Sequence, residues 1–161
     1  MNFQNYFKNK IALITGSGRG IGLEIAKEYL KHGAKVIAID LNTKRLLNLK
    51  NKHRNNILIK KFDLSNLDNF NSFLKKLPKN FQNINILINN AGMKSAENLV
   101  KTDINNLNNL INFNSIKVIE ISRILINFSL KKNKGRIINI GSSLSSHGAV
   151  FRAQGGGSDY S

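Results

Sequence analysis

Short apolar runs alternate along the chain with longer stretches in which apolar residues recur at helical spacing. The short runs predict buried strands over residues 10–15, 35–40, 57–62, 85–88 and 136–140. The longer stretches predict one helix that follows a glycine-rich turn and ends near residue 31, then helices over residues 43–52 and 65–77, and two helices within residues 103–130. Because strands alternate with helices, we expect an α/β fold: a doubly wound parallel sheet with helices on both faces and about five strands.

The predicted helices carry apolar stripes that would pack on this sheet. The stripe of the first comprises Ile21, Ile25, Ala26 and Leu30, and Gly33 suits the left-handed residue that ends such a helix. The stripe of the third comprises Leu67, Phe70, Phe73, Leu74 and Leu77, and Pro78 ends it. Residues 116–130 are apolar on more than one side, which predicts burial of both faces.

The composition is that of an ordinary globular chain and excludes several classes of function. With 161 residues, 41% of them hydrophobic, we expect one domain over residues 1–161. No cysteine is present and the three histidines lack metal-ligand spacing, so we expect no disulfide, no cysteine nucleophile and no metal site. The N-terminus lacks the apolar segment of a secretory signal, and no apolar run reaches membrane-spanning length, so we expect a cytoplasmic protein without a membrane partner.

The formal charge of +16 raises the question of nucleic-acid binding. The lysines are scattered and accompanied by many asparagines and isoleucines, which is typical of a compositional bias that places charge on solvated faces. We therefore expect no specific nucleic-acid partner, although weak, salt-sensitive binding is compatible with this charge.

A glycine-rich turn, Thr15-Gly16-Ser17-Gly18-Arg19-Gly20-Ile21-Gly22, connects the first predicted strand to the first predicted helix. Glycines here allow a tight turn, close approach of a pyrophosphate to the backbone, and packing of helix on strand. The helix N-terminus adds N–H groups and the positive end of the helix dipole. We expect a Rossmann-like dinucleotide site, although the spacing is G-x-x-x-G-x-G, with contributions from Gly16, Ser17, Arg19, Gly20, Ile21 and Gly22.

An acidic residue, Asp40, ends the second predicted strand. A carboxylate there can accept hydrogen bonds from both ribose hydroxyls and repels a 2′-phosphate, so Asp40 favours NAD(H) as cofactor. Arg19, Lys44 and Arg45 favour NADP(H), because a cation in this region could pair with that phosphate. We give more weight to Asp40 and expect NAD(H), with NADP(H) as the less favoured cofactor.

Several motifs, in order along the chain, resemble the compact branch of the short-chain dehydrogenase/reductase family. The glycine turn matches the family's T-G-x-x-x-G-[IL]-G, and Asp63-Leu64 matches the acidic and hydrophobic pair that holds the adenine. Asn89-Asn90-Ala91-Gly92 matches N-N-A-G after the fourth strand, so Asn90, Ala91 and Gly92 are expected at the cofactor. The matches cover nearly the whole chain.

The resemblance also implies a set of catalytic residues. Asn114 lies at the position of the family's active-site asparagine, and the GRIINIGSS segment places the catalytic serine at Ser142, or at Ser143 if the register shifts by one. Tyr160 matches the start of the family's Y-x-x-x-K. The implied activity is hydride transfer between nicotinamide and a carbonyl or alcohol carbon of a small molecule. Tyr160 would act as acid/base and Ser142 would polarise the substrate oxygen.

The chain also departs from the family pattern. It ends at Ser161, before the family's lysine and last two strands, so we expect the fifth strand to be an uncovered edge and this chain alone to be inactive and prone to aggregate. Lys117 stands where the family usually has glycine, and the loop before Tyr160 is longer than usual. In the family the second face of helix 116–130 meets another subunit, so we expect a homo-oligomer for the complete protein.

Three other classes of function remain open at this point. A non-catalytic NAD-binding module, or a truncated remnant, would bind cofactor without turnover. A sugar-nucleotide enzyme of the extended branch is disfavoured by the glycine spacing. A basic nucleic-acid binder would show salt-dependent DNA binding and indifference to NADH.

Overall fold

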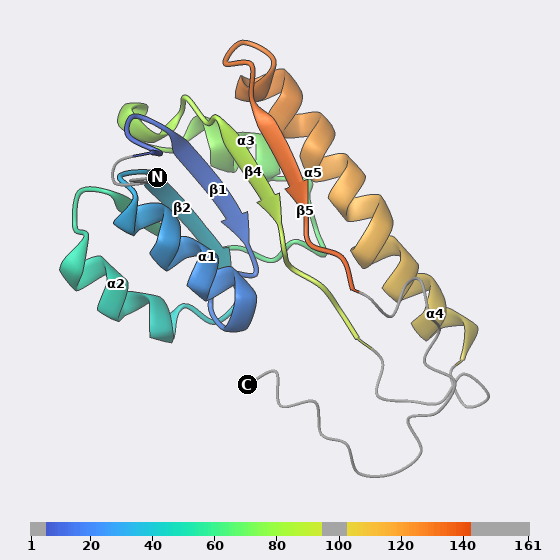
Figure 1. The fold of residues 1–161 in the computed structure, drawn as a ribbon. Coiled ribbons are helices and arrows are strands. Elements are labelled where there is room, and N and C mark those ends of the chain that lie inside the picture. The colour runs from blue at the N-terminus through green and yellow to red at the C-terminus, as the bar shows by residue number, and fades with distance from the viewer. Residues whose placement is uncertain (1–5, 95–102, 143–161) are drawn as a thin grey trace.

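A five-stranded parallel sheet forms the centre of the computed structural model, which describes residues 6–94 and 103–142 (Figure 1). The strands are β1 (Ile11–Thr15), β2 (Lys35–Asp40), β3 (Ile57–Lys61), β4 (Ile86–Asn89) and β5 (Arg136–Asn139), in the spatial order β3-β2-β1-β4-β5. The order reverses between β1 and β4, as in a doubly wound sheet. The predicted α/β, Rossmann-like fold is confirmed.

The helices before β4 are α1 (Gly20–Lys31), η1 (Lys44–Leu46), α2 (Leu47–Lys52), α3 (Phe70–Lys75) and η2 (Lys79–Phe81). After β4 come α4 (Ile104–Ile111), η4 (Asn112–Ile116), α5 (Lys117–Leu125) and η5 (Ile126–Leu130). Helices α1 and α2 cover one face of the sheet, and α3 and α5 cover the other (Figure 1). In the described part of the chain, no helix is long and apolar enough to cross a membrane.

Each face of the sheet carries its own core, because successive strand residues point to opposite faces. Ala12 and Ile14 of β1 pack with Ala26 and Leu30 of α1, and all four are buried. Leu13, between them in sequence, packs on the opposite face with α3 and α5. Strands buried on both faces explain the near-continuous apolar runs seen in the sequence.

Helix α3 is shorter than the predicted helix over residues 65–77. The Asp63 carboxylate accepts a hydrogen bond from the Ser65 amide at 2.9 Å, and the Asn66 side chain accepts one from the Asp68 amide at 2.9 Å. Such local bonds offer the backbone an alternative to the helix. The predicted apolar stripe nevertheless packs in the core, where Phe70 and Leu74 are fully buried.

Helices α4 and α5 are the two helices predicted within residues 103–130, and they form one continuous helical run. Asp103 caps its start by accepting hydrogen bonds from the Asn105 and Asn106 amides at 2.6 and 3.0 Å. The π-helical turn η4 joins α4 to α5 without a break, and η5 ends the run. Single π-helical turns of this kind often mark functional sites.

Within the described residues, all four residues of β5 and one stripe of the long helix are exposed. Ile137 and Ile138 of β5 are 37% and 40% exposed, and β5 is an edge strand within the described sheet. On the helix, Ile121, Ile124 and Leu125 are buried against the sheet. The exposed stripe contains Ile104, Ile111, Ile116, Ile119 and Ile126.

Candidate functional site

A cavity of about 870 Å³ lies at the carboxyl ends of the strands. Ligands of open parallel sheets bind at this edge, where the strand order reverses. Ten of the residues expected at the cofactor line the cavity: Gly16, Arg19, Gly20, Ile21, Asp40, Asp63, Leu64, Asn90, Ala91 and Gly92. The remaining lining residues are Leu41, Phe62, Ser65, Met93, Lys94 and Phe113.

Gly16 is required by both backbone conformation and space. Its φ of +63° lies in the left-handed region, which favours glycine. A Cβ there would stand 2.7 Å from the Ala91 Cα. The glycine therefore lets the turn after β1 lie directly against the segment after β4.

Gly20 faces open space at the start of α1. Its φ is +53°, and a Cβ built on it would meet nothing within 4 Å. The first N–H groups of α1 lack partners within the helix, and the positive end of the helix dipole lies here. A pyrophosphate fits this open, positive position, and no side chain stands in the way.

Ser17 and Gly22 do not line the cavity but lie beneath the turn. The buried Ser17 hydroxyl donates to the Ile39 carbonyl at 3.2 Å. A Cβ on Gly22 would clash with the Gly16 carbonyl oxygen, so this glycine lets α1 approach the turn. Ile21 is 54% exposed and lines the cavity, so its expected place on the apolar face of α1 was wrong; Leu23 is buried there instead.

Thr15 joins the glycine turn to the segment after β4. Its hydroxyl donates to the Ile88 carbonyl at 3.3 Å and accepts from the amides of Asn90 and Ala91 at 3.0 and 3.1 Å. The Asn90 side chain donates in return to the carbonyls of Thr15 and Gly16 at 3.1 and 2.8 Å. The two walls of the cavity are thus held in one hydrogen-bonded network.

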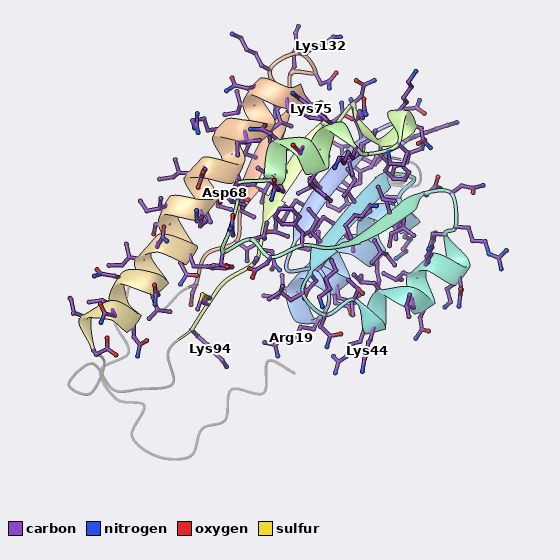
Figure 2. The ribbon with its side chains drawn as sticks, turned by 180° about the vertical axis from the view of Figure 1, so that it is seen from behind. Arg19, Lys44, Asp68, Lys75, Lys94 and Lys132 are labelled. Carbon is purple, nitrogen blue, oxygen red and sulfur yellow. The ribbon has the colours of Figure 1, made fainter. Side chains whose placement is uncertain are left out.

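Asp40 binds two backbone amides of the loops that surround it. One carboxylate oxygen accepts from the Gly18 amide at 2.7 Å and the other from the Asn42 amide at 2.8 Å. The carboxylate thus ties the glycine turn to the loop after β2. Arg19 and Lys44 lie at this same end of the molecule (Figure 2).

Asp63 and Leu64 follow β3 on the neighbouring wall. The exposed Asp63 carboxylate accepts from the Ser65 amide and side chain, and these bonds lower its pKa below the ordinary 3.8. Leu64 is buried, and Phe62 packs edge-on against Phe70 at 5.3 Å between ring centroids. An apolar wall next to an anchored carboxylate suits a flat heterocycle with polar edges, such as adenine.

Asn114 lies in the π-helical turn η4, and its side chain hydrogen-bonds the backbone of the segment after β4. Its Oδ1 accepts from the Met93 amide at 2.8 Å, and its Nδ2 donates to the Met93 carbonyl at 2.8 Å. This reciprocal pair fixes the segment that carries Gly92 and Lys94. The structure thus brings Asn114 next to the predicted cofactor residues.

Of the other two predicted catalytic residues, only Ser142 belongs to the described part of the chain. Ser142 is exposed three residues beyond β5, and β5 pairs with β4 through Asn139 and Asn89, which places the serine at the same edge as Asn90. Tyr160 lies outside the described residues, as does Ser143. Lys117, at the usual glycine position, pairs with Glu120 at 3.0 Å.

Most of the other lining residues lie at, or just after, the carboxyl ends of strands. Leu41 directly follows β2, and Phe62 directly follows β3, so their position at strand ends could have predicted them. Met93 and Lys94 extend the predicted segment after β4. Phe113 could not be found this way, because only the packing of η4 beside that segment brings it to the cavity.

Residues 10–156 match the family described as short chain dehydrogenase, and the chain belongs to this family. It is 34% identical over 137 residues to the NADP-dependent 3-hydroxy acid dehydrogenase YdfG of Escherichia coli, covering 84% of this chain and 55% of that protein. It is 32% identical over 150 residues to the 3-oxoacyl-[acyl-carrier-protein] reductase FabG of Salmonella typhimurium, covering 91% of this chain and 60% of that protein. The chain thus spans little more than half the length of these curated relatives.

Solved structures show the same fold. The closed form of serine dehydrogenase complexed with NADP+ superposes with a TM-score of 0.76 at 33% identity, covering 84% of this chain and 55% of that chain. A short chain dehydrogenase from Burkholderia cenocepacia in complex with NADP gives a TM-score of 0.76 at 26% identity, covering 87% of this chain and 58% of that chain.

The preference for NAD(H) expected from Asp40 is wrong. The relative YdfG is NADP-dependent, and the matching serine dehydrogenase structure holds NADP+. The physical reason lies in the contacts of the carboxylate, since both of its oxygens already accept backbone amides. Asp40 thus has a structural task in joining two loops, and its presence does not decide the cofactor.

Proposed function

We propose that the chain forms the cofactor-binding part of an NADP(H)-dependent oxidoreductase that interconverts a carbonyl and an alcohol of a small molecule. The observation that carries this proposal is the cavity at the strand ends, with the open Gly20 at the N-terminus of α1. When bound there, NADPH supplies a hydride from its nicotinamide ring. With one proton, the carbonyl becomes the alcohol and NADP+ remains.

The residues of this chain would bind and orient the two reactants. The amides at the start of α1 hold the pyrophosphate, and the Arg19 guanidinium pairs with the 2′-phosphate. Leu64 and Asp63 hold the adenine end. Asn90, Ala91 and Gly92 form the opposite wall, which the Thr15 hydroxyl keeps in place.

Proton transfer and polarisation are assigned to the two residues that the family resemblance implies. The Ser142 hydroxyl donates a hydrogen bond to the substrate oxygen. The Tyr160 hydroxyl gives its proton to that oxygen during reduction and takes it back during oxidation. Asn114 contributes by holding the Met93 backbone in position.

The exposed isoleucines support a homo-oligomer. Ile104, Ile111, Ile119 and Ile126 are between 39% and 65% exposed on one continuous helical run. Two such runs packed together would remove these side chains from water. Sedimentation should show a species larger than one chain, and a cooperatively folded monomer would contradict the assignment.

The cofactor site is tested by a matched pair of substitutions. Asn tolerates positive φ, so Gly20→Asn preserves the backbone while its side chain enters the open space. We expect it to weaken NADPH binding, followed by nicotinamide fluorescence, at least tenfold, a factor worth ~1.4 kcal/mol. The control is Gly33→Asn, which also has positive φ (+88°) but lies at the opposite end of α1.

The two substitutions separate the possible outcomes. Tight NADPH binding that only Gly20→Asn weakens supports the proposal. Equal binding by both variants and the unmodified chain would place the cofactor elsewhere. Cofactor binding without turnover in the complete protein would favour the non-catalytic module.

A further inference from the structure

A second cavity, of about 360 Å³, is lined by the end of the edge strand β3 and by residues in and around helix α3. Its volume falls within the range of roughly 300–1,000 Å³ that is typical of small-molecule sites. We propose that this cavity binds a small aromatic carboxylate, an anion that carries a flat apolar ring. The inference goes beyond the proposed function and does not depend on it.

The second cavity is distinct from the cofactor cavity. Phe62 lines both cavities, and no other described residue does. The other lining residues of the second cavity are Lys60 of β3 and members of the segment 69–77. A ligand bound here would contact Phe62 but none of the glycines expected at the pyrophosphate.

Two phenylalanine rings form the apolar part of the cavity. The rings of Phe62 and Phe73 lie 4.9 Å apart between centroids, and Phe73 stacks on the fully buried Phe70 at 5.6 Å. Phe62 and Phe73 are themselves half-buried and line the cavity. Aromatic rings attract a further ring in offset-stacked or edge-to-face contact, so this supported pair suits a ligand with an aromatic ring.

Lys60 brings a positive charge to the same cavity from the strand. Its neighbours two residues away, Leu58 and Phe62, pack against the core on the α3 side of the sheet. Because alternate strand residues point to the same face, the half-buried Lys60 points to that side as well. An inward-pointing lysine on an edge strand also discourages pairing with another chain. That role concerns the strand alone and does not explain a second cation on α3.

The second cation is Lys76, the residue that ends α3. None of the described lining residues is acidic, and neither Lys60 nor Lys76 belongs to an ion pair in the described part of the chain. Both ammonium groups can therefore take an anion from outside the chain. A carboxylate offers one oxygen to each of them, and such charge-assisted hydrogen bonds are stronger than neutral ones.

Two neutral polar side chains complete the cavity. Asn69 and Ser72 line it, and Asn69 does not use its side chain to cap α3. An amide and a hydroxyl can each donate a hydrogen bond to a carboxylate oxygen. The cavity thus combines an aromatic surface with donors and cations, and it lacks a competing carboxylate among the residues described.

The test compares an acid with a neutral analogue and with the acid lacking its ring. Binding of 3-phenylpropionate, 3-phenylpropionamide and propionate to the chain is measured at neutral pH by NMR titration of the Ser72 and Lys76 amides, with and without saturating NADPH. We expect 3-phenylpropionate to bind about tenfold more tightly than its amide, as for one charge-assisted contact, and at least about tenfold more tightly than propionate. It should still bind when NADPH is saturating.

Adjacent lysines provide matched controls. Lys60→Gln and Lys76→Gln should each reduce the preference for the acid over the amide about threefold, and the double variant should abolish it, because the two ammonium groups share one carboxylate. Lys61 and Lys75, the latter labelled in Figure 2, are exposed and do not line the cavity. Lys61→Gln and Lys75→Gln should therefore keep the full preference. A role of Lys60 in protecting the strand edge would not change a ligand preference.

The outcomes decide the inference separately from the proposed function. Equal binding of acid and amide, no binding of 3-phenylpropionate, or an equal loss of preference in the Lys61 and Lys75 variants would overturn it. Displacement of the acid by NADPH would place the acid in the cofactor cavity and would overturn it as well. Failure of the unmodified chain to bind NADPH would overturn the proposed function alone, because the comparison without cofactor still reads the second cavity.

Discussion

Replacing Thr15 with valine should destabilise the chain by about 2 kcal/mol, because it leaves two backbone donors without their acceptor. The Thr15 hydroxyl accepts from the amides of Asn90 and Ala91 at 3.0 and 3.1 Å, and Thr15 is 1% exposed. Leaving a buried donor unsatisfied costs ~1–3 kcal/mol. Asn90 and Ala91 are only half-buried, so the lower end of that range, ~1 kcal/mol for each amide, applies.

Thr15→Ser is the matched control, since it keeps the hydroxyl and removes only the methyl group. Loss of one buried methyl costs ~1 kcal/mol. Valine has the shape of threonine and keeps the methyl, so sterics alone would rank it as the milder change. Because valine cannot accept the two amide hydrogen bonds, we expect it to be the more severe change.

Urea unfolding followed by circular dichroism measures both variants. The expected order of stability is the unmodified chain, then Thr15→Ser, then Thr15→Val. For a chain of this size, ~2 kcal/mol corresponds to a fall in Tm of roughly 4–8 °C. A Thr15→Val variant as stable as Thr15→Ser or more stable would refute the reasoning, because it would show that the two amides do not depend on the hydroxyl.

Three further substitutions test separate parts of the site. Arg19→Gln should weaken NADPH binding about tenfold or more, as expected for a lost charge-assisted contact, and leave NADH binding unchanged. The control is Arg136→Gln, at the start of β5 and away from the cavity. An equal loss of NADPH and NADH binding in Arg19→Gln would contradict the pairing of Arg19 with the 2′-phosphate. Asp63→Asn should lower the free energy of unfolding at neutral pH. The hydrogen bonds that lower the pKa of Asp63 add stability above the ordinary pKa of 3.8, and this stability is lost as the pH falls through the lowered pKa. The difference in urea midpoint between the variant and the unmodified chain should therefore shrink as the pH falls below 3.8, and a constant difference would disprove the role of the charge. Asn114→Ala should remove both hydrogen bonds to Met93 and speed amide hydrogen exchange at Met93. The control, Asn108→Ala on the exposed side of α4, should leave this exchange unchanged. Unchanged exchange in Asn114→Ala would show that these hydrogen bonds do not hold the Met93 backbone.

The sheet and the phosphate turn could be predicted from the sequence because both rest on local patterns. Strand β2 has the predicted bounds, and β1 differs from its prediction at one end only. Buried parallel strands read as continuous apolar runs, which leave little doubt about their extent. The glycines of the turn are equally local, since their conformation and close contacts belong to one short segment.

The parts that could not be predicted depend on contacts between distant segments or on competing local bonds. The start of α3 was misplaced because the side chains of Asp63 and Asn66 bind nearby amides, an alternative that apolar spacing does not reveal. Phe113 became a site residue only through the packing of η4 beside the segment after β4. The cofactor preference failed because the task of Asp40 is set by the Gly18 and Asn42 amides.

We propose the cavity at the strand ends as the NADP(H) site. Its most direct test is an amide NMR titration of the chain with NADPH. We expect shifts concentrated at residues 16–22, 40–41, 62–65 and 90–94, with none at Gly33 or Asn85, which lie at the opposite end of the strands. Saturable shifts centred elsewhere, or no saturable shifts at all, would contradict it.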